Sequence, residues 1–205
     1  MTDSQSYTRD RKKGVPMAQD KKNQILTAAI DIFSEIGIEH AKVSDVVQRA
    51  GVAQGTFYLY YSSKHALIPA MAEQLLHEQL DSLKAYVQDE DPFDKNIRQM
   101  VDTIFSVTER YQHVLALCYS GLAMGGGLSE WEIIYEPYYQ WMDRLLEDAQ
   151  ARGEVRKNIN VRITSKLVTG MMEEAAEQLY LFDENAAQAE AYKKEAIQFI
   201  VRALM

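Results

Sequence analysis

The chain contains one cysteine, few prolines and no long apolar run. Its 205 residues include one Cys, four Pro and ten Gly, and 47% of them are hydrophobic. Because Cys118 has no partner cysteine, no internal disulfide can form, and a reducing, cytoplasmic setting is expected. No segment approaches the apolar length that crosses a bilayer, and the polar N-terminus lacks the apolar region of a signal peptide. We therefore predict a cytoplasmic globular protein that does not contact membranes.

Residue patterns typical of metal binding, cofactor binding and catalysis are also missing. The histidines are scattered, and His113 with Cys118 lacks the second closely spaced pair of a zinc site. Serines, histidines and acids are present, but their spacing indicates no nucleophile–base pair. The triplet at residues 125–127 is not followed by the Gly-Lys-Ser/Thr of a phosphate-binding loop. We therefore predict a protein that is not an enzyme and that holds no metal and no cofactor.

Charge is divided unevenly along the chain. The net charge is −8, yet residues 1–64 carry nine Lys/Arg against seven Asp/Glu. Residues 65–205 carry thirteen Lys/Arg against twenty-three Asp/Glu. This division favours a basic N-terminal part that contacts phosphates and an acidic part that stays away from them.

Residues 41–64 read AKVSDVVQRAGVAQGTFYLYYSSK and fit two short helices joined by a tight turn. The first helix is predicted at about 44–50 and the second at about 55–61. Gly51 suits the left-handed position that ends the first helix, because glycine adopts it without a Cβ clash. The unit is typical of the helix-turn-helix, whose second helix reads the major groove of DNA.

The second helix of this unit carries side chains suited to DNA contact. Phe57 and Tyr61, four residues apart, form a core-facing stripe, and the other positions are polar or amphipathic. The predicted DNA-contacting residues are Ser44, Gln54, Gly55, Thr56, Tyr58, Tyr60 and Lys64. Among them, Lys64 is placed to meet a phosphate. The same geometry also occurs in proteins that bind no nucleic acid.

This segment resembles the TetR family of transcriptional regulators. Family members carry a pattern close to T-V-x-x-I-A-x-x-A-G-V-S-x-G-T-x-Y-x-Y-F-x-S-K-x-x-L, and the similarity is specific over residues 25–67. The residues that match it directly are Val43, Val46, Ala50, Gly51, Val52, Gly55, Thr56, Tyr58, Tyr60, Ser63, Lys64 and Leu67. Ala41 and Ala53 stand where the family has capping Thr and Ser, so Ser44 and Gln54 are the expected replacement caps. The resemblance implies binding to double-stranded operator DNA.

Apolar residues recur at helical spacing from residue 20 onward, and no alternating strand pattern occurs. We predict an all-α protein of about nine helices, with an N-terminal three-helix helix-turn-helix domain and a larger C-terminal helical bundle. The predicted divisions are a flexible segment at 1–19, a DNA-binding domain at 20–64, and a ligand-binding and dimerisation domain at 65–205. Basic residues within 9–13 are typical of a DNA minor-groove arm or of a disordered leader, and we favour the leader.

An aromatic cluster lies at residues 131–141 and surrounds Pro137. Aromatic residues at helical spacing are as often core as binding site, and both interpretations stay open. The family resemblance implies an effector cavity among the C-terminal helices. The predicted pocket residues are Met100, Cys118, Met124, Trp131, Tyr135, Tyr138, Trp141, Met171 and Glu174. Within this set, Cys118 is expected to be an inert core thiol rather than a redox sensor.

Acidic residues near the aromatic cluster suggest the effector's charge. Glu173, Glu174 and Glu177 lie close together in the sequence, and aromatic faces with partly buried carboxylates attract cations. A flat or elongated lipophilic cation is therefore the predicted effector class. The alternative is that the three glutamates form a solvated helix face.

The last two helices, predicted at about 161–182 and 186–204, carry more apolar surface than one face needs, which predicts a homodimer through them. Together with the resemblance, this implies a repressor that a small-molecule effector releases from a palindromic operator. The alternative is a helical sequestering or partner-binding protein whose helix-turn-helix no longer binds DNA. Only the regulator would show a steep salt dependence and a strong preference for one palindrome.

Overall fold

The structure is a computed structural model that describes residues 17–122, 128–183 and 185–205. The described residues form eight α-helices and no strand, which confirms the all-α prediction. The helices are α1 (Met17–His40), α2 (Val43–Ala50), α3 (Gln54–Tyr60), α4 (Ile68–Tyr86), α5 (Phe93–Leu122), α6 (Leu128–Arg152), α7 (Val161–Glu177) and α8 (Ala189–Leu204). Residues 1–16 of the predicted flexible segment, the glycine triplet and Met124 lie outside the described residues.

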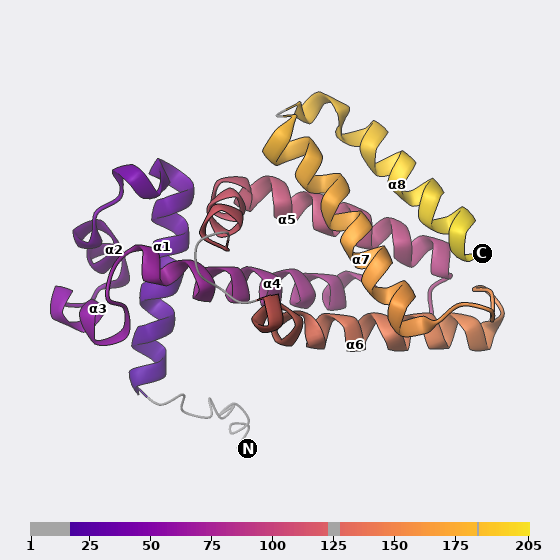
Figure 1. Cartoon of the computed structure of the whole chain (residues 1–205), viewed down its shortest axis with the longest axis horizontal. Coiled ribbons are helices and arrows are strands. Elements are labelled where there is room, and N and C mark those ends of the chain that lie inside the picture. The colour runs from indigo at the N-terminus through magenta and orange to yellow at the C-terminus, as the bar shows by residue number, and fades with distance from the viewer. Residues whose placement is uncertain (1–16, 123–127, 184) are drawn as a thin grey trace, which may run out of the picture.

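Figure 1 shows α1, α2 and α3 gathered at one end of the molecule and α6, α7 and α8 in a larger group, with α4 and α5 extending from the larger group to the smaller one. In the larger group, α5 packs against α4, α7 and α8, while α6 packs against α4 and α7. No described helix is long and apolar enough to span a membrane.

Sequence signals set several helix ends. Gly37 interrupts α1 with φ 73° and ψ 154°, a backbone conformation that favours glycine. Asn160 caps α7, because its Oδ1 accepts a hydrogen bond from the Ile163 N–H at 3.0 Å. Pro69 lies in the first turn of α4, where a proline removes no hydrogen bond that the helix uses. A bend at Pro69 would require a helix that begins near residue 64, and α4 begins at Ile68.

Buried apolar residues form two separate clusters. The N-terminal core joins α1, α2 and α3 to the first half of α4 and to the second half of α5. The C-terminal core joins the second half of α4 and the first half of α5 to α6, α7 and α8. The helices α4 and α5 therefore each contribute residues to both cores. A movement of either helix in one core also displaces its residues in the other core.

The two cores meet along α4 and α5 at identifiable residues. On α4, Leu75 belongs to the N-terminal core and the next residue, Leu76, to the C-terminal core. On α5, Phe105 belongs to the C-terminal core and Tyr111 to the N-terminal core. Helical geometry is interrupted at Tyr111, with φ −111° and ψ 15°, and its hydroxyl donates to Glu78 Oε1 of α4 at 2.6 Å. The change of core thus coincides with a kink that a side-chain hydrogen bond ties to α4.

Candidate nucleic-acid interface and effector site

The turn between α2 and α3 has helix-turn-helix geometry. Gly51 follows α2 with φ 66° and ψ 31°, the left-handed conformation predicted for it. Its N–H donates to the Gln48 carbonyl at 3.3 Å, and the Val52 N–H donates to the Val47 carbonyl at 3.0 Å. These two bonds satisfy carbonyls at the end of α2 and fix the direction in which α3 leaves.

The helix starts differ from the predicted ones by one residue, and the predicted caps are wrong. α2 is preceded by Lys42, whose backbone N–H donates to Asp45 Oδ2 at 2.9 Å, so Asp45 and not Ser44 closes this end. Ser44 is exposed and donates only to its neighbour Asp45. Ala53 precedes α3 without a side-chain cap, so Gln54 does not replace the missing serine.

The faces of α3 divide as the sequence predicts. Phe57 is fully buried and Tyr61 is nearly so, with their ring centroids 5.9 Å apart in the N-terminal core. Burial raises the pKa of the Tyr61 phenol, with a smaller contribution from the charge of Glu73. Of the predicted DNA-contacting residues on α3, Gln54, Gly55 and Tyr58 are exposed, and Thr56 and Tyr60 are half-buried. Leu59, which the sequence analysis did not select, is exposed beside them.

Lys64 does not point away from the protein as a phosphate contact would. Its ammonium donates to the carbonyls of Ile38 at 2.5 Å, Ala41 at 3.2 Å and Glu39 at 3.4 Å. These carbonyls lie at the end of α1 and in the chain that leads to α2, where orphan acceptors need donors. Without DNA, Lys64 therefore ties the segment that leads into α4 to the end of α1, and its contact with a phosphate stays a prediction.

An ion pair fixes α2 against α1 on the outside of the N-terminal domain. Both terminal nitrogens of Arg49 donate to the two carboxylate oxygens of Glu35, each at 2.9 Å. The side-chain hydrogen bond from Arg49 lowers the pKa of Glu35. This two-pronged geometry orients α2, and through the Gly51 turn it also orients α3.

Only part of the predicted effector pocket comes together. Met100, Tyr138 and Trp141 are buried in the C-terminal core, and Tyr135 packs against it half-buried. The Tyr138 and Trp141 rings meet edge to face with centroids 6.1 Å apart. The position of these four residues fits the prediction that they pack in the core, and it is also compatible with the prediction that they contact an effector.

Other predicted pocket residues lie elsewhere. Cys118 belongs to the N-terminal core beside the Ile68 carbonyl, because α5 changes core at Tyr111, and burial raises the pKa of its thiol to about 12. Glu174 is exposed on α7 and accepts a hydrogen bond from Gln178 at 2.6 Å. Met171 is half-buried and lines a groove between α7 and α8. The side chains of Met124 and Trp131 lie outside the part of the chain that the structure describes.

A partly buried polar cluster lies between α4, α6 and α7 beside the C-terminal core. The Glu173 carboxylate accepts hydrogen bonds from Gln79 Nε2 at 2.8 Å and from the Tyr135 hydroxyl at 3.1 Å. Burial raises the pKa of Glu173 to about 7, the charge of Glu177 adds to the rise, and the two hydrogen bonds oppose it. The Tyr138 hydroxyl and, one turn before Glu173, Thr169 Oγ1 are buried without a well-formed hydrogen bond among the described residues. Buried polar atoms of this kind need a partner.

Gln79 and Thr169 are not among the residues predicted from the sequence, although the position of Gln79 is unusual. Gln79 stands on α4 among Leu75, Leu76, Leu80 and Leu83, which are all buried. An amide inside an apolar helical stripe is unexpected unless a polar group faces it. That signal would have directed attention to the interior of the bundle rather than to the aromatic cluster alone.

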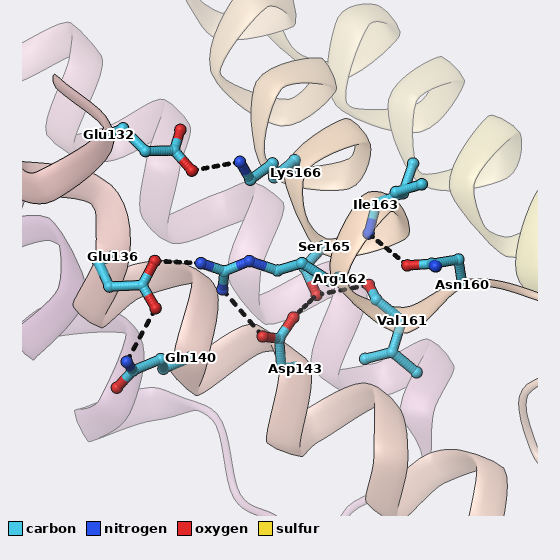
Figure 2. A network of polar contacts seen from close by, with 10 residues as sticks. All are labelled: Glu132, Glu136, Gln140, Asp143, Asn160, Val161, Arg162, Ile163, Ser165 and Lys166. Atoms are coloured by element: carbon cyan, nitrogen blue, oxygen red, sulfur yellow. Dashed lines mark hydrogen bonds and ion pairs between the residues drawn. The ribbon is translucent and has the colours of Figure 1, made fainter. Parts of the chain in front are cut away.

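Figure 2 shows a second polar network, which joins α6 to the start of α7. Arg162 donates to Asp143 Oδ2 at 2.9 Å and to Glu136, and Ser165 Oγ donates to Asp143 Oδ1 at 2.6 Å. Arg162 and Lys166 also lie over the Tyr139 ring, at 5.2 and 5.3 Å from its centroid. The cation-attracting face of Tyr139 is therefore already used by the protein itself, and this network clamps two helices rather than forming a site.

Family models match the two parts of the chain separately. Residues 25–71 match the model described as bacterial regulatory proteins, tetR family, and residues 97–204 match the one described as Tetracyclin repressor-like, C-terminal domain. The chain belongs to the TetR family of transcriptional regulators. It is therefore a DNA-binding regulator with a helix-turn-helix, and the predicted resemblance is confirmed.

Relatives agree over nearly the whole length. The HTH-type transcriptional regulator YvdT of Bacillus subtilis (strain 168) is 43% identical over 184 residues, which cover 90% of this chain and 95% of YvdT. The fatty acid degradation regulator FadR of Bacillus halodurans has a TM-score of 0.67 and 22% identity, covering 93% of this chain and 97% of FadR. FadR of Bacillus subtilis in complex with stearoyl-CoA has a TM-score of 0.67 and 20% identity, covering 88% and 97%. At these identities, the two FadR structures establish the shared fold.

Proposed function

We propose that this regulator is a cytoplasmic repressor that binds a palindromic operator as a homodimer and leaves it when a small molecule binds in the C-terminal core. The observation that carries the proposal is the pair of cores joined by α4 and α5, one holding α3 and the other holding buried polar atoms that lack partners. The proposal requires no catalytic step. The division into a DNA-binding part at 20–64 and an effector and dimer part at 65–205 belongs to it.

The helices α4 and α5 give the proposed release a physical route. An effector that moves Gln79 or its neighbours on α4 shifts the same helix that carries Ile68 to Leu75 in the N-terminal core. The hydrogen bond from Tyr111 to Glu78 couples α5 to this movement. A ligand shifts such an equilibrium only by its difference in affinity for the two arrangements. The spacing of two reading helices in a dimer is then the property that changes.

The proposed dimer face comprises the outer sides of α7 and α8. Leu167 and Ile163 on α7 are 65% and 57% exposed, and Phe199 on α8 is 62% exposed. Other apolar residues of these two helices are already buried in the C-terminal core, including Val168, Met172 and Ile200. The exposed apolar surface left for a dimer partner is therefore smaller than the sequence predicts. A Cβ added at Gly170 would meet no atom within 4 Å, so close approach by a partner helix explains the glycine better than internal packing does.

Sedimentation velocity tests the dimer. Leu167→Glu places a charge on the proposed face and is expected to give monomers at micromolar concentration. Ile133→Glu is the control, because Ile133 is 74% exposed but lies on α6 and not on α7 or α8. A monomeric wild-type protein, or equal behaviour of both variants, would refute the proposed interface.

For the effector, we propose a lipophilic cation that pairs with Glu173. The half-buried Glu173 accepts a hydrogen bond from the Tyr135 hydroxyl at 3.1 Å beside the C-terminal core, and a desolvated carboxylate without a cationic partner is costly to ionise. A cation would supply that partner, and the phenol faces would add to the attraction. Glu174, which is exposed, takes no part in this site.

A second effector class is favoured by the relatives. FadR of Bacillus subtilis is a relative of the same fold that was solved with stearoyl-CoA, so an acyl thioester is the alternative ligand of this core. Such a ligand has no positive charge to pair with Glu173. Its acyl chain would contact the apolar residues of the C-terminal core instead.

A thermal-shift panel separates the two effector classes. Lipophilic cations, acyl-CoA esters and neutral aromatic compounds are each added to wild type, Glu173→Gln and the exposed control Glu174→Gln. Cations are expected to raise the melting temperature of wild type and Glu174→Gln, but not of Glu173→Gln. If acyl-CoA alone raises the melting temperature, and equally in all three proteins, the effector is an acyl thioester and the cation proposal is wrong.

Selection of operators from random DNA tests the regulator against the alternative of a sequestering protein. A repressor is expected to enrich one palindrome, with half-sites about one helical turn apart or a multiple of it. Its affinity is expected to fall steeply with salt. Enrichment of no sequence, with shallow salt dependence, would favour sequestration.

A further inference from the structure

Two neighbouring residues on α3 have properties that the protein's own packing does not explain. Leu59 is 79% exposed, more than any other large apolar side chain among the described residues. Gly55 precedes it by four residues, so both lie on one face of α3. Phe57 and Tyr61 occupy the buried face of the same region. The strip formed by Gly55 and Leu59 therefore faces away from the N-terminal core.

Glycine is not required at position 55 by the backbone or by internal neighbours. Gly51 and Gly37 have positive φ angles of 66° and 73°, whereas Gly55 lies within α3 and has none. A Cβ built on Gly55 would meet no atom within 4 Å. Glycine also weakens a helix relative to alanine. The missing side chain is therefore explained by something that approaches from outside the chain.

Leucine at position 59 narrows the kind of group that approaches. A leucine side chain has no hydrogen-bonding atom, so it cannot pair with a phosphate or with the polar edge of a base. In the major groove, the thymine C5 methyl group is the one apolar feature that a base pair presents. A helical side chain also leans toward the N-terminus and covers the preceding turn, which here is the turn that contains Gly55.

We propose that Leu59 reads a thymine methyl group in the operator, and that the bare backbone at Gly55 lets the DNA come close enough for this contact. The proposal rests on the DNA-binding function and adds the residue pair that reads one base. Gln54 and Tyr58, on the adjacent exposed strip, remain free for polar contacts. Loss of the methyl contact is expected to weaken operator binding about three- to fivefold per half-site.

The test is a double-mutant cycle between protein and DNA. Each thymine of the selected operator is replaced in turn by deoxyuridine, which removes only the methyl group, symmetrically in both half-sites. One of these deoxyuridine replacements is expected to weaken operator binding by the wild-type protein and to leave operator binding by Leu59→Ala unchanged. Ile133→Ala, which truncates an exposed apolar side chain on α6, is expected to respond as wild type does.

The outcomes separate this inference from the general DNA-binding function. If every deoxyuridine replacement affects Leu59→Ala and wild type equally, Leu59 reads no methyl group and the proposal is wrong. If wild type selects no operator at all, the regulator function itself fails.

Gly55→Ala gives an independent readout with effects of opposite sign. Thermal unfolding of the DNA-free protein is expected to shift upward, because alanine favours the helix and nothing in the chain opposes its Cβ. Operator affinity is expected to fall, because the new methyl group stands between the backbone and the DNA. An unchanged operator affinity in this stabilised variant would overturn the role of Gly55.

Discussion

The helices α3 and α6 are both rich in aromatic residues, but they place them in opposite surroundings. Tyr58 on α3 is 53% exposed, whereas Tyr138 on α6 is 1% exposed. α3 lies against α1 and α2, which cover one of its faces, and α6 packs against α4 and α7 inside the larger bundle. Aromatic spacing alone therefore does not distinguish a binding face from a core, because the neighbouring helices decide which it becomes.

The same contrast holds for polar groups. On α3 they face solvent, where water satisfies them until DNA arrives. In the C-terminal core, Tyr138 and Thr169 are buried and their hydroxyls lack a well-formed hydrogen bond among the described residues, while the half-buried Glu173 accepts hydrogen bonds from Gln79 and Tyr135. The contrast applies to the exposed face of α3 and not to the whole N-terminal core, where Ser34 Oγ and the Tyr61 hydroxyl are also buried without a well-formed hydrogen bond among the described residues. In the C-terminal core, burial of such groups opposes folding, and the proposed effector would offset this cost by supplying partners.

The largest expected effect comes from truncating one tyrosine in each region. Tyr138→Ala is expected to lower the free energy of unfolding by about 3–5 kcal/mol, because it opens a cavity in the C-terminal core. Tyr58→Ala is expected to change it by about 0.5 kcal/mol or less, while weakening operator binding. Urea unfolding followed by circular dichroism measures the first quantity, and fluorescence anisotropy with operator DNA measures the second. Equal destabilisation by both substitutions would contradict the comparison.

The next effect is a pH dependence that belongs to the C-terminal core. The pKa of Glu173 is raised from 4.5 to about 7, so between these values the folded protein holds a proton that the unfolded chain has released. The stability that this proton provides is present below pH 4.5 and is lost as the pH rises toward 7. Glu173→Gln is expected to remove this loss and to be more stable than wild type at pH 8 by about 1–3 kcal/mol.

The control for this prediction is Glu174→Gln, which changes an exposed carboxylate one residue away. Denaturant unfolding of the three proteins is compared from pH 4 to pH 8. The wild-type and Glu174→Gln curves are expected to coincide, while Glu173→Gln diverges upward from about pH 5. Parallel curves for all three would show that the Glu173 carboxyl titrates as an ordinary exposed acid.

Local sequence signals predicted the reading unit well, and long-range contacts limited the rest. Gly51 and the pair Phe57 and Tyr61 follow from turn chemistry and helical spacing, which involve only near neighbours. The assignment of Cys118 failed because it depends on where α5 changes core, which no local pattern encodes. In the sequence, Glu173 has the pattern of a solvent-exposed acid. Only the hydrogen bond from Gln79 on α4 shows that its carboxylate faces the other helices of the bundle.

A smaller effect compares two glycines on either side of the turn. Gly51→Ala is expected to destabilise the protein by about 1–2 kcal/mol, because at φ 66° the Cβ of an alanine lies too close to the backbone carbonyl oxygen. Gly55→Ala is expected to change stability in the opposite direction, as argued above. Thermal unfolding of the two variants beside wild type provides the measurement. Destabilisation by both would show that α3 also needs its glycine for folding.

The smallest expected effect concerns Lys64, whose ammonium faces backbone carbonyls of the N-terminal part. Lys64→Met keeps an apolar stem but removes the donor from the carbonyls of Ile38, Glu39 and Ala41. Stability is expected to fall by about 1 kcal/mol, because those acceptors lose their charged partner. Operator affinity is expected to fall moderately, since the end of α1 and the start of α4 are no longer tied together.

The salt dependence of binding decides which role Lys64 has. A lysine that neutralises a phosphate lowers the magnitude of the slope of log affinity against log salt by about one when it is removed. Lys64→Met is expected to leave that slope unchanged, because its ammonium is already held by protein carbonyls at 2.5 to 3.4 Å. A slope reduced by about one would mean that Lys64 leaves these carbonyls for a phosphate when DNA binds. In that case the residue would be a phosphate contact in the complex and a helix tie only in the free protein.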